Sequence, residues 1–190
     1  MPQEILDQDF KGVNYTEAAL PKGEYENCIF SNCNFASSDL TGITFAECKF
    51  ENCDLSLANL KDAAFKDVAF KNCKMLGLRF DDCNSFLLSF NFEDCMLNFV
   101  SFYKLKLKKT SFINCKLEEA EFAEADLSGS VFKNCDLSRA VFRNTNLESA
   151  DLRTAQNFSI DPESNRIGKA RFSTSNIAGL LDKYNIRIEQ

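Results

Sequence analysis

The stretch that decides the fold runs from Thr110 to Leu152 and reads TSFINCKLEEAEFAEADLSGSVFKNCDLSRAVFRNTNLESADL. Every fifth residue in it is large and apolar: Phe112, Leu117, Phe122, Leu127, Phe132, Leu137, Phe142, Leu147 and Leu152. A small residue or a cysteine stands two places before each of these positions. An α-helix repeats every 3.6 residues and a strand every 2, so neither explains a strict period of five. Such a period is typical of a solenoid.

A second period of twenty residues lies inside the first. Phe112 matches Phe132, and Phe122 matches Phe142. Four units of five therefore make one coil, and like residues stack on like residues. Because stacked strands lie about 4.8 Å apart, we expect a core of Phe and Leu columns with one side chain per coil.

The frame of five begins at Phe10 and holds on multiples of five as far as Phe80. From Phe92 onwards the central residues fall two positions later. The break lies in NSFLLSFNF at residues 84–92. From Phe80 to Phe92 the chain advances by two residues more than a whole number of five-residue units. One column is expected to run from Phe10 through Phe70 to Phe90.

A bulge or small loop at one corner is the simplest explanation of the break. Ser85 fits a central position poorly, so Phe86 or Leu87 is expected to replace it. Loops on solenoid faces often bind partners, and a packing irregularity is the simpler alternative.

The repeat becomes irregular at residues 156–166 and returns at Ile167 and Phe172. The stretch from Phe10 to Phe172 corresponds to about eight coils of twenty residues. We therefore predict a β-solenoid domain over residues 1–172 and a separate closing segment over residues 173–190.

The sequence of the closing segment predicts an α-helix over residues 174–184, with Ser173 as its N-cap. Its apolar residues are spaced i, i+3, i+4 and i+7, which gives one apolar face, and they are Ile177, Leu180, Leu181 and Tyr184. A short strand is expected over residues 186–188. Because an open β-edge pairs with other chains unless it is covered, the helix is expected to cap the solenoid and to form a two-fold dimer.

Nine cysteines lie two places before positions of the frame: Cys28, Cys33, Cys48, Cys53, Cys73, Cys83, Cys95, Cys115 and Cys135. This is the small-residue position, so we interpret them as small buried residues. Side chains in one column point the same way, which disfavours disulfides, and zinc needs converging ligands. We therefore expect neither disulfides nor a metal site.

The composition gives no sign of catalysis. The chain has no histidine, which removes the commonest general base. No Gly-rich phosphate loop is present, and no cofactor is expected. No apolar run approaches the length of a membrane span, and residues 1–4 (MPQE) lack a signal-peptide core. We expect a cytoplasmic protein that is not an enzyme.

Surface charge is the remaining functional signal. Residues 1–100 carry 16 acidic and 8 basic residues, whereas residues 101–190 carry 12 acidic and 14 basic ones. Four acidic residues stack in pairs one coil apart, Glu47 with Asp67 and Asp62 with Asp82. A rod with regular negative charge can compete with DNA for a basic groove, while solubility alone is the simpler explanation.

The chain resembles the pentapeptide-repeat proteins, whose repeat is roughly Ala-Asp/Asn-Leu-x-x. The repeat stands here as ADLSG at 125–129, CDLSR at 135–139 and ADLRT at 150–154. The resemblance covers about nine-tenths of the chain. It implies an all-β fold, a right-handed quadrilateral parallel β-helix.

Two segments also resemble the quinolone-resistance (Qnr-type) and mycobacterial (Mfp-type) branch: residues 53–80, and the tail LLDKYNIRI at 180–188. Proteins of that branch are dimeric rods that resemble B-DNA and bind DNA gyrase. The resemblance implies a DNA mimic that binds gyrase or topoisomerase IV, relieves quinolone poisoning and does not itself bind nucleic acid. Its dimer interface would lie at Ile177, Leu180, Leu181 and Tyr184.

Two features depart from that branch. Qnr-type proteins often carry long projecting loops, and no insertion of that length is present. A basic cluster, Lys104, Lys106, Lys108 and Lys109, has the wrong sign for a DNA mimic and could meet an acidic partner. The alternative function is a general protein-interaction scaffold with an unknown partner.

Overall fold

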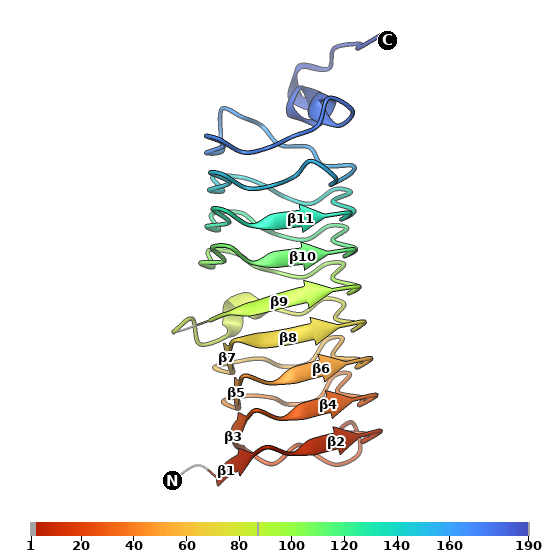
Figure 1. The fold of residues 1–190 in the computed structure, drawn as a ribbon, viewed down its shortest axis with the longest axis vertical. Coiled ribbons are helices and arrows are strands. Elements are labelled where there is room, and N and C mark those ends of the chain that lie inside the picture. The colour runs from red at the N-terminus through yellow and green to blue at the C-terminus, as the bar shows by residue number, and fades with distance from the viewer. Residues whose placement is uncertain (1–2, 87, 190) are drawn as a thin grey trace.

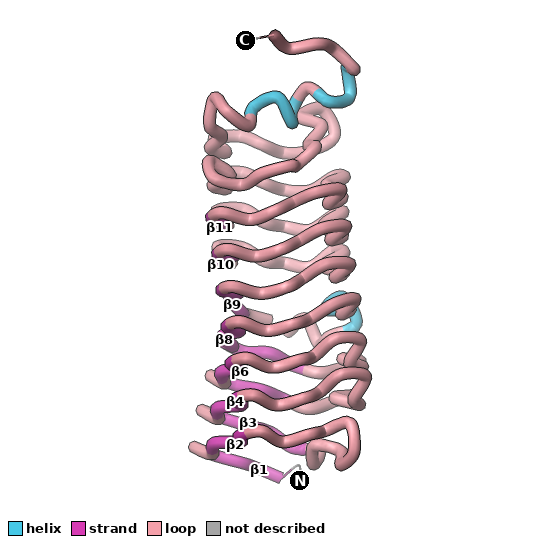
Figure 2. The backbone as a smooth tube through the Cα atoms, turned by 90° about the vertical axis from the view of Figure 1, so that its right-hand side faces the viewer, coloured by secondary structure: helices cyan, strands magenta, loops and turns pink. Residues whose placement is uncertain are grey.

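The computed structural model describes residues 3–86 and 88–189. The chain winds into an elongated stack of coils, with its two ends at opposite ends of the stack (Figures 1 and 2). Short strands repeat from coil to coil and pair in parallel, so the fold is an all-β parallel solenoid.

Two parallel sheets form two sides of the solenoid. The first has the order β1-β3-β5-β7, and the second β2-β4-β6-β8-β9-β10-β11. The strands are β1 (Gln3–Leu6), β2 (Asp9–Lys11), β3 (Gly23–Glu26), β4 (Ile29–Ser31), β5 (Thr44–Ala46), β6 (Lys49–Glu51), β7 (Ala64–Lys66), β8 (Val68–Lys71), β9 (Phe90–Glu93), β10 (Ser111–Ile113) and β11 (Val131–Lys133).

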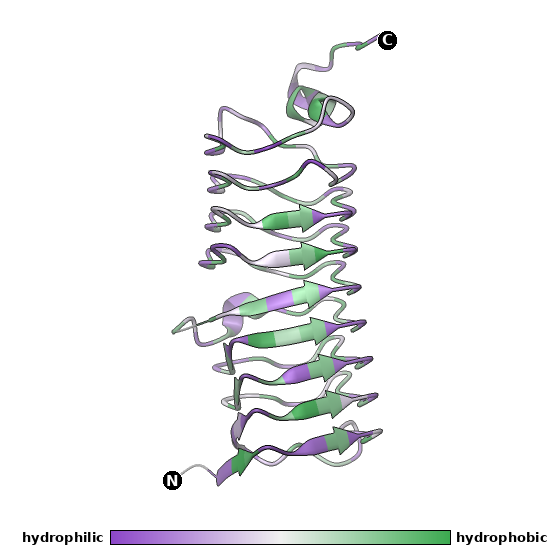
Figure 3. Ribbon diagram, in the orientation of Figure 1, coloured by the Kyte–Doolittle hydropathy of each residue, from purple (hydrophilic) through white to green (hydrophobic). Residues whose placement is uncertain are grey.

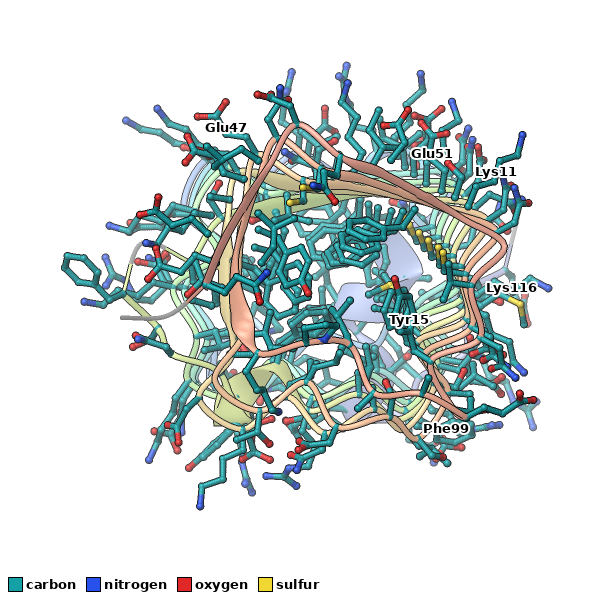
Figure 4. All side chains as sticks on the ribbon, turned by 90° about the horizontal axis from the view of Figure 1, so that it is seen from below. Lys11, Tyr15, Glu47, Glu51, Phe99 and Lys116 are labelled. Carbon is teal, nitrogen blue, oxygen red and sulfur yellow. The ribbon has the colours of Figure 1, made fainter. Side chains whose placement is uncertain are left out.

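The register confirms the twenty-residue coil. Phe10 pairs with Phe30, and Phe112 pairs with Phe132. The other two sides are joined by isolated bridges at the same spacing, such as Asn34 with Asp54 and Asp39 with Asn59. Seen along its axis, the molecule has a four-sided outline (Figure 4).

The strand ladder is shorter than predicted. The seven-stranded sheet spans about six turns, so eight coils are not supported. Beyond β11 only isolated bridges continue the stack, from Val131 to Asp151 and from Asp151 to Arg171. The irregular side at residues 156–166 is part of this last region, where pairing no longer extends over consecutive residues.

The core consists of stacked aromatic columns. The rings of Phe30 and Phe50 lie 4.8 Å apart and nearly parallel, at 11°. Rings on adjacent sides meet edge to face, as Phe45 and Phe50 do at 5.2 Å and 74°. Both geometries suit the ring quadrupole, and burying each ring contributes about 1.5–3 kcal/mol. The strands carry apolar residues next to polar ones, and the turns at their ends are mainly polar (Figure 3).

A residue with positive φ sits at most corners and explains the period of five. Such residues include Asn52, Asp67 and Asn72, with φ between 51° and 55°. The left-handed conformation turns the chain, and Asn and Asp adopt it more readily than other non-glycine residues. A corner every five residues gives the strict spacing, while the inward side chain fills the core.

All nine cysteines are free and buried, as the packing interpretation predicts. Most of them are also hydrogen-bond donors, which the sequence analysis missed. The Cys53 thiol donates to the Phe30 carbonyl oxygen at 3.2 Å, and Cys73 to that of Phe50 at 3.3 Å. One corner shows the sulfur atoms in a row (Figure 4). Burial raises the pKa of the Cys48 thiol to about 12, which keeps it protonated as a donor.

The frame break is a projecting loop on the side that holds β1, β3, β5 and β7 (Figure 1). Phe70 pairs with Phe92, an offset of 22, so the predicted continuation of the column to Phe90 was wrong. Phe86 is 71% exposed and does not replace Ser85 in the core. Leu87 lies outside the described residues.

The predicted α-helix over residues 174–184 was also wrong. The segment forms two 3-10 turns, η2 (Ile177–Leu180) and η3 (Asp182–Tyr184), and residues 186–188 form no strand. The Asn176 amide donates to the carbonyl oxygens of Leu152 (2.8 Å) and Ala155 (2.9 Å). A Cβ on Gly179 would lie 2.3 Å from the Phe158 carbonyl oxygen. These close contacts with the last coil oppose a regular helical path.

Candidate functional site

The structure brings the four predicted acidic residues to one side of the solenoid. We call it the β1 side: the side with β1, β3, β5 and β7, continued past the loop by the bridged residues Lys106, Asp126 and Asn146. Glu47 and Asp67 lie on one of its corners, where Figure 4 labels Glu47. Asp62 and Asp82 lie on the other, joined by the Asp62 N–H to Asp82 carbonyl bond of 3.0 Å.

Four further acidic residues belong to the same surface. Before the loop, this side and its corners carry two basic residues, Lys22 and Lys66, and eight acidic ones: Glu4, Asp7, Glu24, Glu26, Glu47, Asp62, Asp67 and Asp82. All eight are exposed. The sequence analysis missed four of them, although Glu4 and Glu24 lie twenty residues apart and pair in register.

The acidic half is largely without internal neutralisation. Within residues 3–86 and 88–189, only Asp82 among the eight forms an ion pair, with Arg79 at 3.0 Å. Asp81 and Asp82 raise the pKa of the Arg79 guanidinium. Lys22 pairs with Asp39 on a neighbouring side, at 3.0 Å. The surface therefore presents seven carboxylates that neighbouring cations do not compensate.

The predicted basic cluster lies on the same side, past the loop. Arg79 forms a parallel β-bridge with Ser101, 22 residues later in the chain. The same offset places Lys104 on the coil next to Asp82, at the same corner. Lys104 pairs with Glu124 at 3.4 Å, and contacts with Tyr103 and Glu124 raise its pKa. This half carries three acidic residues and six basic ones: Lys104, Lys106, Lys108, Lys109, Arg166 and Lys169.

All three acidic residues of this half are paired: Glu124 with Lys104, Asp126 with Lys108 at 3.3 Å, and Glu148 with Arg166 at 2.9 Å. The excess charge is therefore positive. The β1 side changes sign at the loop, which the sequence could not show without the 22-residue offset.

The loop between the two halves is anchored at both ends in the preceding coil. The Asn84 N–H donates to the Ala63 carbonyl oxygen at 2.8 Å, and the Ser89 N–H to that of Phe65 at 2.9 Å. The Phe86 N–H donates to the Asn84 side-chain oxygen at 3.0 Å. A short, well-anchored loop thus presents an exposed aromatic ring between two surfaces of opposite charge.

The four predicted dimer residues do not share one helical face. Ile177 and Tyr184 are about half exposed, while Leu180 packs against the core. Lys183 pairs with Asp161 at 2.7 Å and with Glu163 at 2.6 Å, and these carboxylates raise its pKa. These contacts hold the tail on the last coil. Ile186 and Ile188, both more than half exposed, extend the apolar surface at this end.

In the described part of the chain, no group of three or more His, Cys, Asp or Glu side chains is placed to hold a metal ion. None of the helical segments there is long and apolar enough to cross a membrane. An open cleft of about 770 Å³ lies between the tail and the last coils, beside Arg153, Asn157 and Asn176.

The model of the pentapeptide repeat region matches residues 43–112 and 105–180. The chain belongs to the pentapeptide-repeat family. No curated protein matches this pentapeptide-repeat protein in sequence.

Solved structures match over nearly the whole solenoid. Full-length QnrB1, a plasmid-mediated fluoroquinolone resistance protein, has a TM-score of 0.64 and 19% identity, with 97% of this chain and 100% of that chain covered. A trypsin-treated QnrB1 variant has a TM-score of 0.65 and 20% identity, with 97% and 99% covered. At about 20% identity, the similarity to QnrB1 shows a shared fold and not a shared function.

Proposed function

We propose that this pentapeptide-repeat protein is a non-enzymatic DNA mimic that binds a type II topoisomerase, DNA gyrase or topoisomerase IV. The surface that binds is the acidic half of the β1 side. The observation that carries the proposal is the concentration there of seven carboxylates without ion-pair partners. A basic groove that evolved to hold DNA attracts such a surface by the same electrostatics.

The charge density supports mimicry over a limited length. Glu4 and Asp82 are four coils apart, which is about 19 Å at the strand spacing. B-DNA carries roughly eleven phosphate charges over that length, counting both strands. One side of the rod carries eight acidic and two basic residues there, so its net charge approaches that of one face of the duplex.

The basic half limits the mimicry to the coils before the loop. Lys106 and Lys109 would repel a DNA-binding groove, so the enzyme engages the N-terminal half of the rod. The C-terminal tail pairs two copies through Ile177, Leu180, Leu181 and Tyr184, together with the exposed Ile186 and Ile188. On this proposal the acidic halves of a homodimer point away from the centre.

Relief of quinolone poisoning is part of the proposal. The solved relative QnrB1 is described as a fluoroquinolone resistance protein. A carboxylate surface that competes for the DNA-binding groove lowers the amount of enzyme trapped on cleaved DNA by the drug. The protein itself then binds no nucleic acid, because its acidic half repels phosphate.

The test is a gyrase supercoiling assay with and without ciprofloxacin, titrated with the protein. We expect inhibition or drug rescue at micromolar concentration or below. The triple variant Glu47→Lys, Asp62→Lys, Asp67→Lys should lose it. A control with the same change in net charge, Asp9→Lys, Glu17→Lys, Glu51→Lys, alters other sides and should retain it. No effect of the native protein on gyrase or topoisomerase IV excludes the proposal.

A scaffold for a different protein is the second candidate. The basic half favours it, because Lys106 and Lys109 suit an acidic partner. If both topoisomerases are unaffected, capture of a partner that is lost in Lys106→Glu, Lys109→Glu but retained in the acidic-half triple variant supports the scaffold.

A further inference from the structure

Two corner residues break the rule that all other corners follow. In the described residues, 24 non-glycine residues have positive φ, and 22 of them are polar or charged. The exceptions are Leu57 (φ 57°) and Phe99 (φ 61°). Their side chains are 67% and 55% exposed.

Neither residue benefits an isolated solenoid. Large side chains adopt the left-handed conformation at a cost that Asn or Asp largely avoids. Exposing them also leaves apolar surface in water. The residues before and after them in the same column, Ser37 and Glu119, follow the polar rule. A site that accepts both costs indicates an interaction surface.

Leu57 and Phe99 lie on either side of Gly77 in one corner column. The Leu57 N–H donates to the Leu76 carbonyl oxygen at 2.9 Å, and the Gly77 N–H to that of Asn98 at 3.0 Å. The three residues are therefore on consecutive coils. A Cβ on Gly77 would lie 2.9 Å from Leu57 Cδ2, so the leucine extends over the glycine.

We call this surface the Gly77 corner: Leu57, Leu76, Gly77, Met96 and Phe99. Met96 is 39% exposed and Leu76 is half-buried, so they widen the apolar area on the adjoining side. Figure 4 labels Phe99 on the corner diagonally opposite Glu47. The apolar surface is thus separate from the β1 side.

We infer that the Gly77 corner is an interface between two copies of this chain, packed side by side and antiparallel. Leu57 lies one coil before Gly77, and Phe99 one coil after it. A two-fold axis through Gly77 therefore places Leu57 of each copy on Phe99 of the other. Gly77 has no side chain at the axis, which leaves room for the Leu57 side chain that extends over it, and the two-fold symmetry makes the contact self-complementary.

The basic residues near the apolar surface are neutralised within each copy. Lys74 lies beside the axis and pairs with Asp54 at 3.3 Å. Arg139, three coils after Gly77 in the same column, pairs with Glu118 and with Glu119. The symmetric placement of Leu57 and Phe99 about Gly77 therefore selects a second copy over an unrelated apolar partner.

The interface is independent of the proposed function. It leaves the acidic half of the β1 side free, and it does not use the C-terminal tail. Because it consists of one corner with a few apolar residues, its area is at the lower end of specific interfaces. We therefore expect a concentration-dependent dimer with a dissociation constant on the order of micromolar.

Sedimentation velocity over a concentration series tests the inference, and it is carried out in the Ile177→Ser, Tyr184→Ser background as well as in the native protein, so that pairing through the tail is separated from pairing at the Gly77 corner. The variant Leu57→Asn, Phe99→Asn should raise the dissociation constant at least about thirtyfold, as expected for the loss of central apolar anchors. Because Asn suits the left-handed conformation, the same variant should keep or raise the unfolding temperature. The control Ser149→Asn, at a distant corner, should change neither quantity.

The tail is tested separately with Ile177→Ser, Tyr184→Ser, which should leave the association at the Gly77 corner intact. A native protein that is monomeric at about 0.5 mM, two orders above the expected constant, overturns the inference. So does a dimer that survives the Leu57 and Phe99 substitutions in a protein that also carries Ile177→Ser, Tyr184→Ser, where the tails no longer pair.

Cross-linking tests the antiparallel arrangement. A Leu57→Cys protein mixed with a Phe99→Cys protein should give a mixed disulfide dimer. Ser37→Cys mixed with Phe99→Cys should not, because Ser37 faces Glu119 across the proposed axis. The native cysteines are buried and do not compete. A disulfide dimer formed by Leu57→Cys alone, in the absence of the mixed product, would indicate a parallel pair and contradict the inference.

Discussion

The two halves of the β1 side, before and after the loop, have the same backbone frame but opposite properties. Before the loop, strands β3, β5 and β7 bury Tyr25, Phe45 and Phe65 and present mainly acidic residues to solvent. After it, bridges replace strands, the buried residues are Leu127 and Leu147, and the outer surface is basic.

The difference shows which features the repeat requires. Both halves keep the left-handed corners and the hydrogen bonds from one coil to the next, such as that from Leu127 N–H to the Asn146 carbonyl oxygen at 2.7 Å. The type of buried side chain and the sign of the exposed charge vary independently. The frame therefore determines the solenoid, and the outer positions are free to encode binding.

Truncating the core should give the largest effect and should differ between the halves. The ring of Phe45 stacks on that of Tyr25, with the ring centroids 5.6 Å apart, and on that of Phe65 at 5.4 Å. Leu127 is aliphatic and makes no ring stacking. We expect Phe45→Ala to cost about 3–5 kcal/mol and Leu127→Ala to lie nearer 2 kcal/mol. Urea unfolding followed by circular dichroism measures both. Equal losses would show that ring stacking adds nothing on this side.

Much of the fold could be predicted because its cause is local. A corner every five residues and an inward side chain between corners leave a direct mark on the sequence, as in residues 110–152. The offset of 22 at the loop is visible from Phe70 and Phe92. The meeting of acidic and basic residues on one side needs that offset and the strand register together, so neither Glu24 nor the position of Lys104 was found.

The tail could not be predicted because its structure depends on distant contacts. The spacing of Ile177, Leu180 and Tyr184 is helical, but Asn176 and Gly179 bind the coil that ends near Phe158. The Gly77 corner was missed for a different reason. Leu57 and Phe99 are ordinary residues in sequence, and only the positive φ makes them unusual.

The hydrogen-bond donors of the small-residue position should give the second largest effect. Before the loop these donors are thiols such as Cys73. After it they include the hydroxyl of Thr145, which donates to the Phe122 carbonyl oxygen at 2.9 Å. We expect Thr145→Val and Cys73→Ala each to cost about 1–3 kcal/mol, because a buried acceptor loses its partner.

Cys73→Ser keeps a donor and should cost less than Cys73→Ala in thermal unfolding. An equal loss for Ser and Ala would mean that the cysteines act by volume alone, as the sequence analysis assumed.

The loop that separates the halves should contribute little to stability. Phe86 is exposed, so Phe86→Ser should change the free energy of unfolding by less than about 0.5 kcal/mol. Phe90 is buried against Phe80 and Phe102, so Phe90→Ala should cost about 3 kcal/mol or more. A large loss of unfolding free energy for Phe86→Ser would show that the loop stabilises the solenoid.

The smallest effect concerns acid stability, and its salt dependence separates the coils before the loop from those after it. Before the loop, the Thr41 hydroxyl, aided by Lys22, lowers the pKa of Asp39 from 3.8 to about 2. After the loop, a hydrogen bond from Arg153, aided by Arg171, lowers the pKa of Asp151. A lowered pKa stabilises the fold above the ordinary value, and the contribution disappears as pH falls through the folded value.

The difference in unfolding temperature between the native protein and Asp39→Asn should therefore be constant above about pH 5, decrease between about pH 4 and 2, and vanish below that. Asp151→Asn should behave in the same direction. Added salt should reduce the Asp151 difference more, because its main partners are charged and solvent ions screen them. An equal effect of salt at both sites would mean that the charge of Lys22, rather than the Thr41 hydroxyl, is the main cause of the lowered pKa of Asp39.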